Sequence, residues 1–132
     1  MPADASAEGR RILLLKTGST VPLLEAKRGD FELWFAAGCG LPLESFDVVD
    51  VSRGEPLPEV GAHGSVIVTG SPALVTDEEP WSEASAAWIA DAVTAEVPLL
   101  AVCYGHQLLA HGTGGRVGDN PRGREIGTVD LD

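Results

Sequence analysis

The sequence is poor in several residue types, and each shortage removes a class of protein. Only two cysteines occur in 132 residues, which is too few for a disulfide framework and favours a reducing, cytoplasmic location. No apolar run approaches the ~18 residues of a membrane helix, so we expect no membrane partner. The sequence has nine basic and twenty acidic residues, and the resulting net charge of -11 repels nucleic acid.

The composition that remains is that of one packed domain. Apolar residues make up 44% of the chain, and 132 residues is close to the common size of a single hydrophobic core. Residues 1–10 are small and polar, without the apolar segment of a signal peptide. We therefore predict a disordered tail at 1–10 and a domain at 11–132.

Short apolar runs alternate with segments of helical spacing. Strands are predicted at 11–16, 46–51, 65–69, 99–102 and 126–131, and helices at 31–37, 81–95 and 104–111. This alternation predicts an α/β fold with a parallel sheet covered by helices on both faces. In such folds ligands bind beyond the carboxyl ends of the strands, where the turns 17–20, 70–72 and 103–105 are expected to converge.

Cys103 ends the last apolar run of this series and precedes a helix. Small neighbours, Ala101 and Gly105, surround it, and this pattern is typical of a nucleophile elbow with sulfur in place of oxygen. The turn exposes the sulfur and directs it toward the amide groups that begin the helix, a setting typical of reactive cysteines. The other reading is a buried cysteine that packs as a small apolar residue.

A cysteine that attacks an amide needs donors for the oxyanion that forms. The backbone amide of Tyr104, the first residue of the helix, is one candidate. The turn Gly70-Ser71-Pro72 offers the second, and because proline has no amide hydrogen the donor is Ser71 or Gly70.

Three segments together resemble the class I glutamine amidotransferases: 102–107 (VCYGHQ), 69–72 (TGSP) and 120–127 (NPRGREIG). The GMP-synthase-like stand-alone members are the most similar, since their first strand also ends in a Thr-Gly turn like that of Thr17-Gly18. The resemblance implies a flavodoxin-like sheet with helices on both faces. The chain would be its N-terminal portion, incomplete at the C-terminus.

The resemblance also implies the chemistry. A domain of this family hydrolyses the side-chain amide of glutamine through a cysteine thioester and delivers ammonia to a synthetase partner, with no cofactor and no metal. Carried over by position, the site residues are the nucleophile Cys103, the backbone oxyanion donors Gly70, Ser71 and Tyr104, and the substrate-binding residues Gln107, Glu125 and Gly127.

The chain departs from the family in one respect. Class I domains carry a His-x-Glu pair on a later turn, and no such spacing occurs here. His63 is predicted at the wrong end of the sheet, His111 too far along its helix, and His106 at a position of packing or solvent. Loss of a proton shuttle costs ~10²-fold or more in rate.

Two alternatives to a glutaminase therefore stay open. One is a non-catalytic binding or regulatory domain that keeps the fold, and the other is a γ-glutamyl peptide hydrolase that uses the same elbow. A partial domain would also expose a sheet edge and an apolar face, which predicts low stability or self-association.

Overall fold

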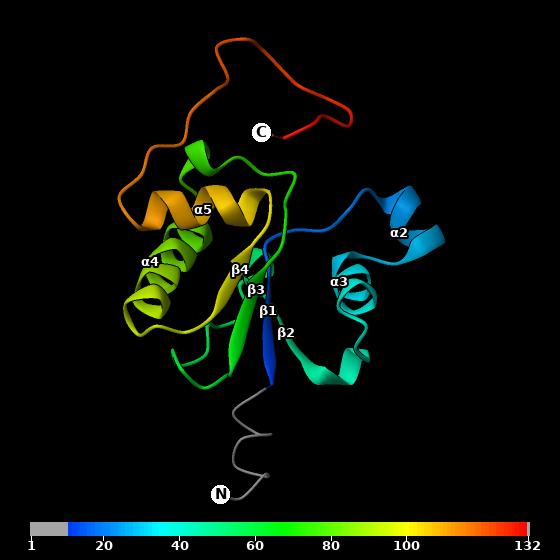
Figure 1. The fold of residues 1–132 in the computed structure, drawn as a ribbon, viewed down its shortest axis with the longest axis vertical. Coiled ribbons are helices and arrows are strands. Elements are labelled where there is room, and N and C mark those ends of the chain that lie inside the picture. Colours follow the sequence, from blue (N-terminus) through cyan, green and yellow to red (C-terminus); the bar gives the residue numbers. More distant parts are fainter. Residues whose placement is uncertain (1–10, 132) are drawn as a thin grey trace, which may run out of the picture.

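The structure is a computed structural model that describes residues 11–131, and the tail predicted at 1–10 lies outside the described residues. Its centre is a four-stranded parallel sheet in the order β2-β1-β3-β4, as Figure 1 shows. The strands are β1 (Ile12–Lys16), β2 (Phe46–Asp50), β3 (Ser65–Val68) and β4 (Leu99–Ala101). The predicted α/β, flavodoxin-like fold is confirmed.

Helices lie on both sides of the sheet. On one side are α4 (Pro80–Thr94) and α5 (Tyr104–Gly112), and on the other are α3 (Phe31–Cys39) and the short α2 (Pro22–Arg28) (Figure 1). Three short 3-10 helices complete the described elements: η1 (Leu43–Ser45), η2 (Val51–Arg53) and η3 (Val75–Asp77). Within the described residues, no helix combines the length and the apolar character needed to cross a membrane.

The apolar runs of the strands divide between two cores because successive side chains of a strand point to opposite faces. Leu13 and Leu15 of β1 are fully buried against the α4 and α5 side, with Ile89 and Leu108. Leu14, between them, is fully buried on the α3 side. This double burial explains why the centre of β1 reads as a continuous apolar run rather than as an alternating one.

Two features of the fold differ from the sequence-based prediction. The predicted fifth strand at 126–131 is wrong, because this segment forms no strand and leaves Ile126 86% and Leu131 91% exposed. A β-strand forms only where the backbone of another strand supplies hydrogen-bond partners. No strand of the described chain lies beside this segment. The helix α2 was not predicted, and none of its residues is buried.

A buried ion cluster joins the end of β1 to the start of α3. The ammonium group of Lys16 lies 2.9 Å from a carboxylate oxygen of Asp30 and 2.9 Å from one of Glu32. Asp30 is the N-cap of α3 and also accepts a hydrogen bond from the Thr20 amide. The cluster therefore fixes the loop that leaves the carboxyl end of β1.

These contacts make stability depend on pH. Burial alone would raise the pKa of Asp30, but hydrogen bonds from the Thr20 amide and the Lys16 ammonium outweigh it and lower the pKa from 3.8 to about 2. A carboxyl group whose pKa is lower in the folded chain than in the unfolded chain stabilises the fold at pH values above the unfolded-state pKa. This stabilisation is lost as the pH falls toward the folded-state pKa. The contribution is on the order of 2 kcal/mol.

We expect Asp30→Asn to remove this part of the acid dependence. Urea unfolding between pH 2 and pH 5 should show a free energy that rises with pH in the wild type and rises less in the variant. Asp91→Asn, at an exposed position on α4, is the matched control and should keep the wild-type slope. Equal slopes for wild type and Asp30→Asn would contradict this account.

The strand β4 forms an edge of the described sheet, and its face toward α3 is exposed. Leu100 is 55% exposed, and beside it lies an apolar pocket lined by Trp34, Phe35, Gly38 and Cys39. An open edge with an apolar neighbour invites pairing with another chain. We therefore expect self-association to occur through the exposed edge strand β4 and the apolar pocket beside Leu100.

We expect Leu100→Lys to raise the monomer fraction of the 132-residue chain in sedimentation velocity, because a charge on an edge strand opposes edge-to-edge pairing. Val93→Lys, at an exposed position on α4, carries the same charge change away from the edge and should leave association unchanged. A wild-type chain that stays monomeric at high concentration would count against β4 as the contact.

Candidate active site

The connection from β4 to α5 is a strained elbow at Cys103. Its backbone has φ 57° and ψ -114°, a conformation that costs a residue with a side chain about 1–3 kcal/mol. The neighbouring backbone holds it there: the Val102 amide donates to the Val68 carbonyl (3.1 Å). The Gly105 amide donates to the carbonyls of Val102 (2.9 Å) and Thr69 (3.1 Å). The strand-to-helix turn thus holds Cys103 at a positive φ and leaves the residue exposed.

Two glycines lie close to the elbow, and one of them is required for its packing. A Cβ atom on Gly105 would lie 2.7 Å from the Val68 carbonyl oxygen, which is too close for any side chain. A Cβ atom on Gly70 would lie 3.5 Å from Cβ and 3.8 Å from Sγ of Cys103. Gly105 therefore brings α5 against β3, whereas a side chain at position 70 would make only ordinary van der Waals contact with Cys103.

Two threonines orient the turn after β3. The Thr17 hydroxyl lies 2.8 Å from the Thr69 carbonyl oxygen and 3.0 Å from that of Gly70. The Thr69 hydroxyl accepts from the Thr17 amide (3.0 Å) and lies 3.1 Å from the same Gly70 oxygen. No peptide bond among residues 11–131 is cis, and in a trans peptide the carbonyl and the next amide point in opposite directions. The Ser71 amide therefore points away from both threonines.

The first turn of α5 is anchored by its tyrosine. Tyr104 is buried, its ring stacks on Trp81 with centroids 5.8 Å apart, and its hydroxyl forms a short hydrogen bond with Ser82. Burial raises the pKa of the Tyr104 phenol. The backbone amide of Tyr104 is the first of the helix and has no acceptor within it. The side chain thus fixes an amide that is available to a ligand.

Cys103 opens into a pocket of about 370 Å3 at the point where the strand order reverses between β1 and β3. This is the position at which doubly wound sheets bind their ligands. Most of the lining is apolar, and the polar groups come from two turns and the thiol. The lining residues are Ser19, Thr20, Val21, Phe31, Phe35, Gly70, Ser71, Pro72, Val102 and Cys103.

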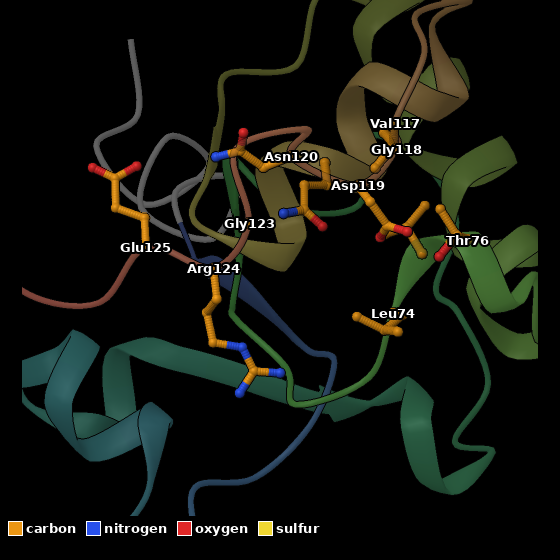
Figure 2. A pocket seen from close by; sticks show the side chains of 11 residues that line it. Leu74, Thr76, Val117, Gly118, Asp119, Asn120, Gly123, Arg124 and Glu125 are labelled. Carbon is orange, nitrogen blue, oxygen red and sulfur yellow. The ribbon is translucent and has the colours of Figure 1, made fainter.

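A second pocket, of about 630 Å3, lies on the α5 side and is more polar. Figure 2 shows its side chains, with those of Arg124 and Glu125 pointing in opposite directions from adjacent positions. The C-terminal segment supplies most of the wall. The lining residues are Leu74, Val75, Thr76, Gln107, Val117, Gly118, Asp119, Asn120, Gly123, Arg124 and Glu125.

The site residues named from the sequence fall into two groups. Cys103, Gly70 and Ser71 share the smaller pocket, and the Tyr104 amide follows directly on the elbow. Gln107 and Glu125 share the larger pocket. Gly127 lines neither of these two pockets, and its positive φ of 123° marks it as a turn residue.

The three histidines lie as the sequence predicted. His63 precedes β3 at the amino end and its Nε2 lies 2.8 Å from a carboxylate oxygen of Asp47. Nε2 of His111 lies 3.0 Å from a carboxylate oxygen of Glu83, and His106 is exposed. In residues 11–131 no hydrogen bond joins a histidine to the elbow thiol. The same residues contain no group of three His, Cys, Asp or Glu side chains placed to hold a metal ion.

Sequence reasoning missed the aromatic wall beside the thiol. Phe31 and Phe35 lie one helical turn apart on α3, a spacing that indicates a core face, and Phe35 indeed also packs on the α3-side core. No signal in the sequence distinguishes such a core face from a pocket wall. The contribution of Ser19 and Thr20 could have been anticipated, because their turn was expected at this edge.

The strain at the elbow can be measured at the two cysteines. We expect Cys103→Gly to be more stable than Cys103→Ala by about 1 kcal/mol, because glycine adopts a positive φ without cost. At Cys39, the last residue of α3, the order should reverse, with Cys39→Ala the more stable by about 0.5–1 kcal/mol. Urea unfolding of the four variants tests this, and the same order at both sites would show that Cys103 is not strained.

Comparisons with known proteins identify the family of the chain. A sequence model of the glutamine amidotransferase class-I family matches residues 45–131. A glutamine amidotransferase-like protein of Schizosaccharomyces pombe is 28% identical over 82 residues, which cover 61% of this chain and 32% of the yeast protein. The crystal structure of a glutamine amido transferase from Methylobacillus flagellatus matches with a TM-score of 0.63 and 30% identity.

That structural match covers 85% of this chain and 42% of the bacterial one. The chain thus spans about a third of the curated relative and less than half of the solved structure. Because the family model matches more than half of the chain, the chain belongs to the class I glutamine amidotransferase family.

Proposed function

We propose that the chain carries the nucleophile half of a glutaminase site, in which Cys103 attacks the side-chain amide of glutamine. The observation that carries the proposal is the strained elbow at Cys103, held by the carbonyls of β3 and β4 at the carboxyl edge of the sheet. Strain of this kind persists where the surrounding structure maintains it, and it occurs most often at functional sites.

The oxyanion is stabilised by two backbone amides in this proposal. Tyr104 supplies the first amide of α5, where the helix dipole also favours negative charge. Ser71 supplies the second amide. We choose Ser71 over Gly70 because the Gly70 carbonyl points toward the two threonines, so the Ser71 amide of the same trans peptide points away from them. Cys103 would then form a γ-glutamyl thioester, release ammonia and be regenerated by water.

Gln107 is the first candidate for binding the glutamine itself. Its backbone amide donates to the Cys103 carbonyl (3.1 Å), so the two residues lie one helical turn apart and about 5–6 Å from each other. This spacing suits a substrate whose side chain reaches the thiol while its α-amino and α-carboxyl groups lie in the larger pocket with Gln107 and Glu125. Gly127 would shape the turn that follows.

The proton shuttle is not among the described groups. His63 and His111 are bonded to carboxylates elsewhere, so we assign neither to the reaction. The chain's own contribution is the thiol, the two amides and the binding of the amino acid. Release of ammonia to a synthetase partner is the use that this chemistry has in the family, and it is part of the proposal.

The test is covalent labelling by a diazo-ketone analogue of glutamine, followed by intact mass and peptide mapping. We expect one adduct, on Cys103 and not on Cys39, with glutamine slowing its formation. Cys39 is exposed as well, so it controls for simple accessibility. Gln107→Ala should slow labelling about tenfold, because it removes a substrate contact without disturbing buried residues.

Two outcomes would decide against a glutaminase site. Absence of any adduct, or equal labelling of the two cysteines, would favour a non-catalytic binding domain of the same fold. Cys103→Ser should abolish the adduct and Cys39→Ser should leave it intact, which confirms where the label resides.

A further inference from the structure

Two pockets near the elbow differ in chemistry: Cys103 lines the smaller one, and Gln107, one helical turn further along α5, lines the larger one. The larger one, with Gln107 and Glu125, is polar and lies on the α5 side of the sheet. The smaller one is lined by Cys103 itself and by residues next to α2 and in α3. These two helices lie on the opposite side of the sheet from α5 (Figure 1). The two share no lining residue. A substrate that spans them would therefore be cut between a polar part and an apolar part.

The smaller pocket is much larger and more apolar than a leaving ammonia molecule requires. Ammonia is small and polar, whereas the wall here is formed largely by Val21, Phe31, Phe35, Pro72 and Val102. An apolar cavity of roughly 150 Å3 is enough to hold benzene, and this pocket has about 370 Å3. Its size and lining fit an aromatic ring or a branched aliphatic group.

The wall of the pocket is held in place by the fold. Phe31 packs edge-to-face on Trp34, with ring centroids 5.6 Å apart, and Phe35 packs on the core beneath α3. Gly18 lets the turn after β1 approach the turn after β3, since a Cβ atom there would lie 2.6 Å from the Ser71 hydroxyl oxygen. The apolar wall and the proposed oxyanion donor thus belong to one rigid arrangement.

From this arrangement we infer that the substrate class is a γ-glutamyl amide whose nitrogen carries an apolar group, which lies in the pocket lined by Val21, Phe31 and Phe35. The inference rests on the proposed function, because it uses the same nucleophile and the same γ-glutamyl subsite. Ammonia and glutamine are then the smallest members of a wider set of leaving groups and substrates.

The reaction is balanced by water alone. Sγ of Cys103 forms a bond to the γ-carbonyl carbon, the carbon–nitrogen bond breaks, and the thiol proton leaves on the apolar amine. Water then adds to the thioester, the carbon–sulfur bond breaks, and glutamate and the free thiol are formed. No oxidant, reductant or cofactor takes part.

The experiment measures how ligands protect the thiol, so it does not require turnover. In a Cys39→Ser background, iodoacetamide alkylates Cys103 at a rate read by intact mass, and added ligand slows it. The ligands are γ-glutamylanilide, γ-glutamylmethylamide and acetanilide. We expect the anilide to protect at a concentration at least tenfold below that of the methylamide, because a buried phenyl group adds that much affinity.

A matched pair of variants locates the effect. Val21→Asp puts a carboxylate at the apolar wall, and because Val21 is the N-cap of α2 the new side chain should preserve the helix. Leu23→Asp makes the same charge change on an exposed residue of α2 that does not line this pocket. We expect Val21→Asp to abolish the tenfold preference for the anilide and Leu23→Asp to keep it.

The outcomes separate this inference from the proposed function. Equal protection by anilide and methylamide, or a preference unchanged in Val21→Asp, overturns the apolar subsite while labelling by the glutamine analogue can still succeed. Protection by acetanilide as strong as that by γ-glutamylanilide overturns the γ-glutamyl amide as substrate class. Failure of the glutamine analogue to label Cys103 removes the proposed function, and the inference with it.

Discussion

The geometry of the site depends on the hydrogen bonds between Thr17 and Thr69. They join the carboxyl ends of β1 and β3, the two strands at which the order of the sheet reverses, and both residues are almost completely buried. The same hydroxyls hold the Gly70 carbonyl and so orient the turn that contacts Cys103. A buried polar group destabilises a fold unless it is hydrogen-bonded, so both threonines can be buried here only because these bonds form.

Charge reinforces this arrangement from the opposite side of β1. Lys16 is the last residue of the same strand, and its contacts with Asp30 and Glu32 fix the start of α3, whose first turn forms part of the pocket wall. In a chain with a net charge of -11, a buried lysine between two carboxylates offsets their repulsion and so helps to order this loop. The apolar pocket beside the thiol is therefore shaped partly by an ion cluster.

The sequence predicted the fold better than it predicted the pockets. Four strands and the elbow at Cys103 were recognisable because buried parallel strands are continuous apolar runs and because the cysteine is followed by Gly105 and a helix. The predicted strand at 126–131 failed, since a pattern of residues does not reveal whether a neighbouring strand is present. Phe31 and Phe35 were hidden for a related reason: spacing identifies an apolar face but not what lies opposite it.

The elbow is built from distant parts of the chain, which has a consequence for synthesis. Two of the carbonyls that hold it belong to Val68 and Thr69, which precede Cys103 by 35 and 34 residues, and the whole of α4 lies between them and Cys103. The chain loses conformational entropy when it closes a loop of this length, and only afterwards do the contacts at the ends of the loop stabilise it. A chain emerging from the ribosome therefore carries an ordinary, unstrained cysteine, and the exposed thiol acquires its special geometry only when β4 pairs with β3.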